Sequence, residues 1–185
     1  MQLLEVKNLF KTFDSKLLSA VNRISFSMNE GEYVSMIGPS GTGKSTTAKM
    51  ICGRLSVGEG EVYLNGELLV SESETNKNLL KKVSYVPQEL SLDANKTIFE
   101  NIAEPIKEES ENFIHHHVRD MIEVFGLQYK DHKYPHEIST GQKQRVEMAK
   151  ALVNKPDLVI LDEPFSNLDQ PLRAQLKDGL LEILD

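Results

Sequence analysis

The chain has 185 residues, of which 39% are hydrophobic and 26% are charged, a composition typical of one soluble globular domain. Its 21 Lys and Arg stand against 28 Asp and Glu, so the formal net charge is −7, which disfavours a nucleic-acid partner. The single Cys52 cannot form an internal disulfide, and no charged-then-apolar leader opens the chain, so we expect a reducing, cytoplasmic compartment. The longest apolar runs are far shorter than the roughly 20 residues of a membrane-spanning helix. If a membrane is involved, another chain must cross it.

Short β-type runs alternate with helical patterns along the chain, which predicts an α/β fold. The runs are residues 3–6, 24–28, 33–37, 62–64, 83–86 and 158–161. Residues 33–37 and 158–161 are almost continuously apolar, as in strands covered on both faces, so we place both in the middle of a mostly parallel sheet. Asn65-Gly66 stands between two apolar stretches and predicts a tight hairpin, hence an antiparallel β element.

A helical pattern covers about residues 91–151 and predicts a helical insert in the α/β core. Five apolar residues fall on one face at 3.6-residue spacing, namely Ile114, Val118, Met121, Ile122 and Phe125. Residues 71–78 are polar without periodicity and predict an exposed loop. Three consecutive histidines, at 115–117, invite interpretation as a metal site, but neighbouring helix positions point about 100° apart, so we expect solvated positions instead.

A glycine-rich loop follows the apolar run at 33–37. Residues 38–45 read Gly-Pro-Ser-Gly-Thr-Gly-Lys-Ser and fit the phosphate-binding pattern of Gly, any four residues, Gly, Lys, then Ser or Thr. The glycines let backbone N–H groups turn toward phosphate oxygens, and the following helix adds its positive end. Lys44 is expected to reach the β- and γ-phosphates and Ser45 to ligate Mg²⁺. The alternative is a glycine-rich turn with an incidental lysine. The candidate nucleotide-binding residues here are Gly38, Pro39, Ser40, Gly41, Thr42, Gly43, Lys44, Ser45 and Thr46.

Two carboxylates follow the apolar run at 158–161. They stand at the carboxyl end of an expected buried strand, the edge where ligands bind in open α/β sheets. Asp162 is expected to hold the Mg²⁺ sphere, and Glu163 to orient or deprotonate the attacking water. The alternative, that both only cap the next loop, would be favoured if the phosphate loop were absent.

A third motif stands between these two, at residues 138–145, which read Ile-Ser-Thr-Gly-Gln-Lys-Gln-Arg. This stretch resembles the Leu-Ser-Gly-Gly-Gln signature of ABC ATPases, with Thr140 in place of the first glycine. Residues 85–88, Tyr-Val-Pro-Gln, resemble that family's glutamine loop, and residues 166–169, Ser-Asn-Leu-Asp, its aspartate loop. Phe13 aligns with the aromatic residue that stacks on adenine. The motifs stand in the family's order across most of the chain.

The resemblance implies ATP and Mg²⁺ as cofactors and assigns further roles. It implies that Gln88 acts in catalysis with Glu163, and that Gln88 joins Ser45 and Asp162 around the metal.

The resemblance also implies that ATP is contacted by Phe13, Ser139, Gly141 and Gln142. The signature would hold the γ-phosphate of ATP on the opposite subunit, so hydrolysis needs two domains arranged head to tail. From the residues alone, Ser139 begins a helix whose exposed N–H groups can hold an anion. Thr140 adds bulk where backbone and phosphate approach, which is expected to weaken the contact across the dimer.

The family's switch histidine would lie on a later strand, beyond Asp185, whereas His132 and His136 precede the signature. We therefore expect residues 1–185 to form a single ABC-type ATP-binding domain without its C-terminal part. Such a chain is expected to hydrolyse ATP more slowly than a version extended through that histidine.

The function implied is that of the ATPase subunit of a bacterial ABC transporter, more of the importer type, because importers commonly have free-standing ATPase domains. It would drive a solute through transmembrane permease subunits, paired with a second ATP-binding domain at the inner face of the cell membrane. Residues 97–102 resemble the region that receives a helix from the membrane subunit. Two alternatives are a soluble ABC ATPase without a membrane partner and a nucleotide-binding module with little turnover.

Overall fold

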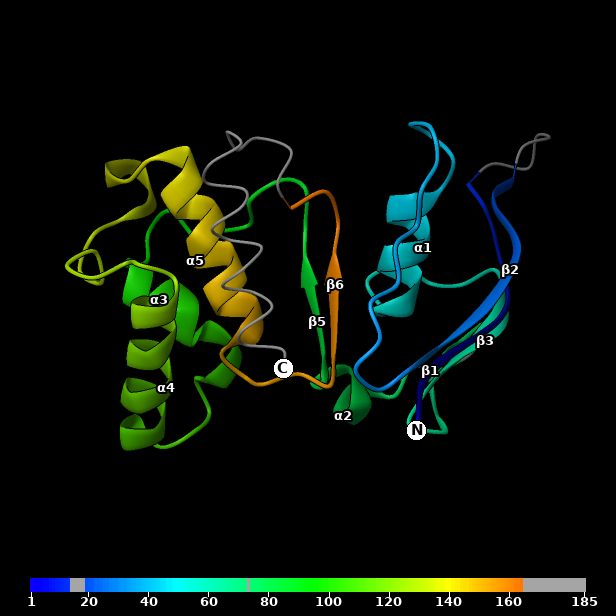
Figure 1. Cartoon of the computed structure of the whole chain (residues 1–185), viewed down its shortest axis with the longest axis horizontal. Coiled ribbons are helices and arrows are strands. Elements are labelled where there is room, and N and C mark those ends of the chain that lie inside the picture. Colours follow the sequence, from blue (N-terminus) through cyan, green and yellow to red (C-terminus); the bar gives the residue numbers. More distant parts are fainter. Residues whose placement is uncertain (14–18, 73, 165–185) are drawn as a thin grey trace. The chain divides into compact units, whose positions relative to one another are not determined.

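Two units make up the computed structural model of the chain, Met1–Ser84 and Tyr85–Asp185 (Figure 1). The structure describes residues 1–13, 19–72 and 74–164. Among these described residues, no helix combines the length and apolar character that crossing a membrane requires.

The first unit is built on a four-stranded sheet in the order β2-β1-β3-β4, with every neighbouring pair antiparallel. Its strands are β1 (Gln2–Thr12), β2 (Ser19–Asn29), β3 (Glu59–Leu64) and β4 (Glu67–Ser71). They contain the predicted runs at 3–6, 24–28 and 62–64. The β1–β3 register pairs Leu4 with Leu64 and Val6 with Val62, and all four side chains are buried. These four side chains contribute to the core of the first unit.

The predicted hairpin joins β3 to β4. Asn65 and Gly66 both have positive φ, 52° and 80°, the backbone conformation that a two-residue hairpin turn requires. The antiparallel pairing of β3 with β4 confirms the prediction.

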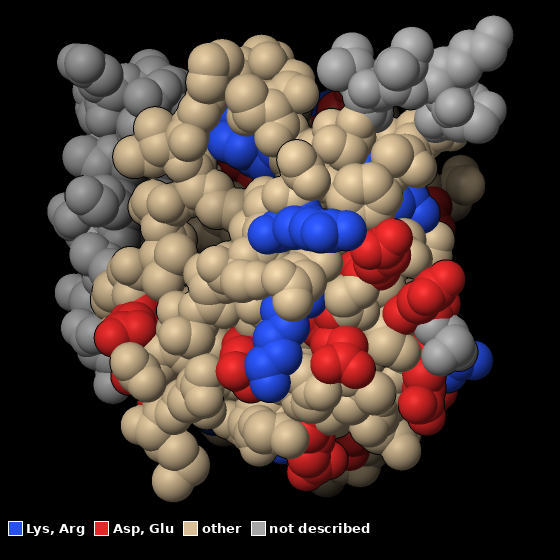
Figure 2. All heavy atoms as spheres, turned by 90° about the vertical axis from the view of Figure 1, so that its right-hand side faces the viewer, with Lys and Arg blue, Asp and Glu red and all other residues tan. Residues whose placement is uncertain are grey.

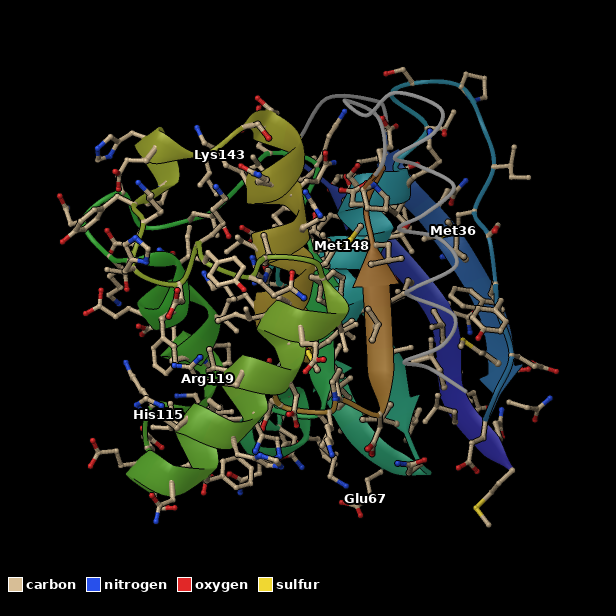
Figure 3. All side chains as sticks on the ribbon, turned by 60° about the vertical axis from the view of Figure 1, so that its left-hand side comes forward. Met36, Glu67, His115, Arg119, Lys143 and Met148 are labelled. Carbon is tan, nitrogen blue, oxygen red and sulfur yellow. The ribbon has the colours of Figure 1, made fainter. Side chains whose placement is uncertain are left out.

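The predicted central strand at residues 33–37 is wrong. β2 ends at Asn29, whose backbone N–H and side-chain amide both donate to the Glu32 carboxylate, at 2.7 and 2.9 Å. After this turn residues 33–37 form no strand, and Ile37 is 95% exposed; Figure 3 labels Met36 on this segment. An apolar run becomes a buried strand only when neighbouring strands pair with it and cover its faces, and no described strand pairs with this one.

Among the described residues of the first unit, two helices complete it, α1 (Lys44–Ile51) and α2 (Lys77–Leu80). α1 contacts β2 and β4 and buries Thr47, Ala48, Met50 and Ile51. The predicted loop at 71–78 is shorter than expected, because Ser71 ends β4 and the Asn76 side chain caps α2 by accepting the N–H groups of Asn78 and Leu79.

The second unit pairs β5 (Val83–Val86), which begins just before the boundary, with β6 (Leu158–Leu161). Both strands coincide with predicted runs, and their arrows in Figure 1 point the same way, as in a parallel pair. Five helical segments lie between them in the chain: α3 (Ile98–Ala103), η1 (Glu104–Ile106), α4 (Glu111–Val124), η2 (Pro135–Glu137) and α5 (Thr140–Leu152). The α/β class is therefore confirmed, with antiparallel and parallel parts in different units.

The core of the second unit is formed mainly by helices α3, α4 and α5. The predicted face of α4 is correct, since Val118, Met121, Ile122 and Phe125 are buried and Ile114 packs against them while partly exposed. Ile98 and Ile102 from α3 join them, as do Val146, Met148 and Ala149 from α5. This packing holds α5, whose start carries the predicted residues Ser139, Gly141 and Gln142.

Candidate functional site

The phosphate loop, residues 38–45, runs into the first turn of α1. Gly43 is the N-cap with φ 89°, and its carbonyl oxygen accepts the N–H (2.8 Å) and hydroxyl (2.9 Å) of Thr47. The loop therefore ends at the positive end of a helix dipole, the place where a helix attracts an anion.

Lys44 folds back over this loop. Its Nζ donates to the carbonyl oxygens of Gly38 (2.9 Å) and Pro39 (2.8 Å), and the Thr42 hydroxyl also donates to Pro39 (2.9 Å). The ammonium group therefore lies against the loop, among carbonyl oxygens that a phosphate oxygen could replace as its partner.

In the second unit, Asp162 lies directly after β6 and is buried. Its Oδ2 accepts the hydroxyl of Tyr85 from β5 at 2.9 Å, and its backbone N–H donates to Val86 at 3.0 Å. The neighbouring strand therefore orients the carboxylate that we predicted as a metal ligand.

Glu163 is exposed and has a positive φ of 49°. The Gln88 side chain, two residues after β5, donates Nε2–H to Glu163 Oε2 at 3.0 Å. The structure thus brings together the two residues predicted to act in catalysis, 75 positions apart in the chain.

The signature stretch begins α5. Ser139 is the N-cap, its hydroxyl accepts the N–H of Gln142 (3.3 Å), and the Gln142 side chain accepts the N–H of Ser139 (3.0 Å). This capping box orders the helix start that carries Gly141. Gln142 therefore stabilises the helix start itself, which the sequence analysis did not anticipate.

None of the contacts described so far involves Phe13 or the predicted aspartate loop. Phe13 follows β1 and is 61% exposed. Residues 166–169, the predicted aspartate loop, lie outside the described residues.

The histidines of α4 lie on the surface of the helix, as expected. The His116 ring is 3.6 Å from Asp120 and the His115 ring lies near Phe99, and Figure 3 shows His115 on α4. Within the described ranges, no group of three or more His, Cys, Asp or Glu could hold a metal ion.

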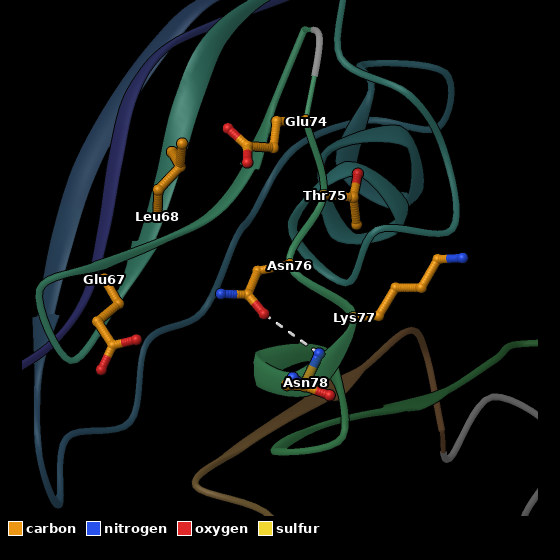
Figure 4. Close-up of a pocket in the computed structure, with 7 residues that line it drawn as sticks. All are labelled: Glu67, Leu68, Glu74, Thr75, Asn76, Lys77 and Asn78. Atoms are coloured by element: carbon orange, nitrogen blue, oxygen red, sulfur yellow. Dashed lines mark hydrogen bonds between the residues drawn. The ribbon is translucent and has the colours of Figure 1, made fainter.

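A separate pocket of about 630 Å³ lies beside β4 and α2 (Figure 4). Glu67, Glu74 and Lys77 line it, together with Asn76, whose amide oxygen accepts the Asn78 N–H at 3.2 Å. None of the predicted nucleotide-binding residues lines this pocket. It therefore does not coincide with the candidate site.

Sequence reasoning missed two contacts of the second unit. One is the Tyr85 hydroxyl on Asp162, and the other is a link from Ser91 to the buried Glu147 of α5. The sequence does contain one signal for the contact of Glu147: this carboxylate stands between the apolar residues Val146 and Met148 of α5.

A phosphate loop at a helix start and two carboxylates at the end of a β-strand are features of the α/β nucleotide-binding proteins that carry a phosphate loop. A family comparison is more specific: the sequence profile described as ABC transporter matches residues 21–166. The chain belongs to the ABC transporter family.

Individual relatives agree with this membership. The chain is 35% identical to the sulfate/thiosulfate import ATP-binding protein CysA of Nitrosomonas europaea, over 98% of this chain and 50% of that protein. It is 38% identical to the spermidine/putrescine import ATP-binding protein PotA of Thermotoga maritima, over 92% of this chain and 45% of that protein. The chain thus spans about half the length of these relatives.

A solved structure has the same fold. The dimeric post-hydrolysis state of the ATP-binding cassette MJ0796, bound to ADP and Pi, matches with a TM-score of 0.87 at 27% identity. The match covers 99% of this chain and 83% of that one. Fold, motifs and family membership therefore agree.

Proposed function

We propose that the chain binds and hydrolyses Mg-ATP as the ATPase subunit of an ABC importer, and that its two units work as one ATP-binding domain. The observation that carries this proposal is the curled phosphate loop, in which Lys44 lies against the loop carbonyls at the start of α1. The post-hydrolysis MJ0796 cassette and the import ATP-binding relatives support the same assignment.

The chemistry of the predicted metal ligands fits Mg²⁺. Ser45, Asp162 and Gln88 offer a hydroxyl, a carboxylate and an amide, all oxygen donors of the hard kind that this ion prefers. The Tyr85 hydroxyl on Asp162 Oδ2 keeps that carboxylate oriented. When bound, Mg²⁺ would neutralise charge on the β- and γ-phosphate oxygens.

The proposed roles of the protein groups follow from their contacts. Lys44 and the N–H groups of the loop hold the phosphates by charge and hydrogen bonds. Glu163 orients the attacking water and accepts its proton, and Gln88 holds that carboxylate through the 3.0 Å bond to Oε2. Ser139 and Gly141, at the start of α5, would face the γ-phosphate of ATP on a second domain arranged head to tail.

The partners are a second ATP-binding domain and transmembrane permease subunits, which would place the chain at the inner face of the cell membrane. Residues 97–102, proposed to receive the permease helix, form the N-cap and most of α3, where Thr97 and Glu100 make a capping box. Acidic and basic side chains are interspersed on the face shown in Figure 2.

Phosphate release tests the proposal directly. The chain should release phosphate from ATP only with Mg²⁺ present, at protein concentrations high enough for dimers to form. Glu163→Gln keeps an oxygen that can accept from Gln88 but lacks the basic carboxylate, so it should bind ATP normally and release no phosphate. An unchanged steady-state rate in this variant would remove Glu163 as the base.

A further inference from the structure

We propose that Glu147 is a positioning residue of this site: from α5 it holds the segment after Gln88 and thereby keeps the Gln88 amide against Glu163. This inference rests on the proposed function, because it assigns Glu147 a part in the same reaction. Glu147 touches neither Gln88 nor Glu163 in any hydrogen bond described above, so its effect must pass through the backbone.

Two hydrogen bonds between Ser91 and Glu147 join distant segments of the chain. Glu147 Oε2 accepts the backbone N–H of Ser91 (3.2 Å), and Oε1 accepts the Ser91 hydroxyl (2.5 Å). The two residues are 56 positions apart, and Glu147 is only 4% exposed. Both carboxylate oxygens are thus engaged by one residue that lies three positions after Gln88.

Glu147 is a buried carboxylate with apolar neighbours on its helix, so packing alone does not explain it. Val146, Met148 and Ala149 beside it belong to the hydrophobic core, so an aliphatic side chain would suit the packing of this helix. A buried carboxylate is costly unless its oxygens are paired. The pairing with Ser91 offsets that cost and ties α5 to one defined point of the chain.

The chain around Gln88 is held at two ends. On one side Val86 belongs to β5, and its carbonyl accepts the Asp162 N–H at 3.0 Å. On the other side is the link from Ser91 to Glu147. Since three residues span at most about 10 Å, fixing Ser91 restricts where Gln88 can lie. Without that link, the next anchor is Asp93, which exchanges two hydrogen bonds with the buried Asn101.

The same helix also holds the other member of the pair. Gln144, one turn before Glu147 and therefore on the same face of α5, donates Nε2–H to the carbonyl of Pro164, the residue after Glu163. α5 thus anchors the segment of Gln88 through Glu147 and the segment of Glu163 through Gln144. The helix therefore adds a second constraint on the spacing between Gln88 and Glu163, beside the hydrogen bond from the Asp162 N–H to Val86.

The first test is kinetic. Glu147→Ala should lower kcat at saturating ATP about 10-fold, as loss of an orienting partner does, while the Kd for ATP stays within about twofold. Glu147→Gln retains one acceptor and should lose less, and Ser91→Ala, which keeps the backbone N–H, should also lose less. Glu104→Gln removes a carboxylate that pairs with Lys96 and Lys107 in the same unit, and it should leave kcat unchanged.

The second test separates positioning from simple stabilisation. In a Gln88→Ala background, Glu147→Ala should change kcat by less than about twofold, because the residue through which it acts is gone. If Glu147→Ala lowers kcat by the same factor in the chain with Gln88 and in the Gln88→Ala variant, the inference is overturned. If Gln88→Ala lowers kcat but Glu147→Ala does not, the inference fails while the proposed function stands.

The third test needs no catalysis. The chain has no tryptophan, so Glu89→Trp introduces a single indole at an exposed position beside Gln88. Adding Glu147→Ala should lower the fluorescence anisotropy of that indole, and adding Glu104→Gln should not. Unchanged anisotropy would overturn the inference even if the chain hydrolysed no ATP, an outcome that would separately refute the proposed function.

Discussion

Gly43 and Ala20 approach so closely that a Cβ on Gly43 would lie 2.0 Å from the Ala20 carbonyl oxygen. Gly43 also has a φ of 89°, in the left-handed region that residues with a side chain rarely adopt. Glycine at this position is therefore required by the contact between the phosphate loop and β2, as well as by the turn itself.

Gly43→Ala should unfold the phosphate loop or displace it from β2. The positive φ alone costs about 1–2 kcal/mol, and the clash with backbone adds to that, so both stability to urea and ATP affinity should fall. Gly41→Ala is the matched control, because Gly41 has φ 82° but nothing within 4 Å of an added Cβ. Equal losses in the two variants would show that the approach to Ala20 is unimportant.

Local pattern was enough to predict strands that are paired within the described residues. Residues 83–86 and 158–161 became β5 and β6 with the expected bounds, and the Asn65-Gly66 turn joined β3 to β4. The run at 33–37 has the same apolar character, yet it remains exposed. Its burial depends on partner strands, which its own composition cannot specify.

The candidate site was predictable as a set of residues, and its cross-chain contacts were not. Short motifs identified Lys44, Asp162 and Glu163 because each follows an expected strand or begins an expected helix, and the family resemblance identified Gln88. The bonds from Tyr85 to Asp162 and from Ser91 to Glu147 join residues 77 and 56 positions apart, and no periodic pattern reports such pairs.

Tyr85→Phe should weaken the metal site. It removes the donor to a buried carboxylate, which costs about 1–3 kcal/mol in stability and should lower the apparent Mg²⁺ affinity in ATP hydrolysis about 10-fold. Tyr63→Phe removes a comparable bond, from Tyr63 to Glu61 (2.8 Å), at an exposed site, and should change neither quantity. Denaturant unfolding and magnesium titration of phosphate release would measure both variants, and indistinguishable results would contradict the role of Tyr85.

Glu104 should make stability depend on pH in the acid range. Hydrogen bonds from Lys96 and then Lys107 lower the pKa of its carboxyl from 4.5 to about 2. Because the pKa is lower in the folded chain, the stabilisation is present above pH 4.5 and is lost as the pH falls toward 2. The side chain is about a third exposed, so the effect should be small. The stability difference from Glu104→Gln should be measurable at pH 7 and shrink as the pH falls from 4.5 toward 2, and a difference that stays constant over this range would contradict the prediction.

Cys52 should be unreactive in the folded chain. Burial is the main cause that raises the pKa of its thiol, so little thiolate forms near neutral pH. A colourimetric thiol reagent should modify Cys52 slowly under native conditions and rapidly in denaturant. Fast modification of the native chain would show that Cys52 is accessible.

Calorimetric titration of Mg-ATP into the chain and into Lys44→Ala tests the central claim most directly. Lys44 supplies a charged hydrogen-bond donor to the phosphates, worth about 1.5–3 kcal/mol, so the variant should bind about 10- to 100-fold more weakly. Unfolding of both proteins must be compared, because Lys44 also donates to Gly38 and Pro39 within the loop. Equal affinity in the folded chain and the folded variant would contradict the assignment of residues 38–45 as the phosphate-binding site.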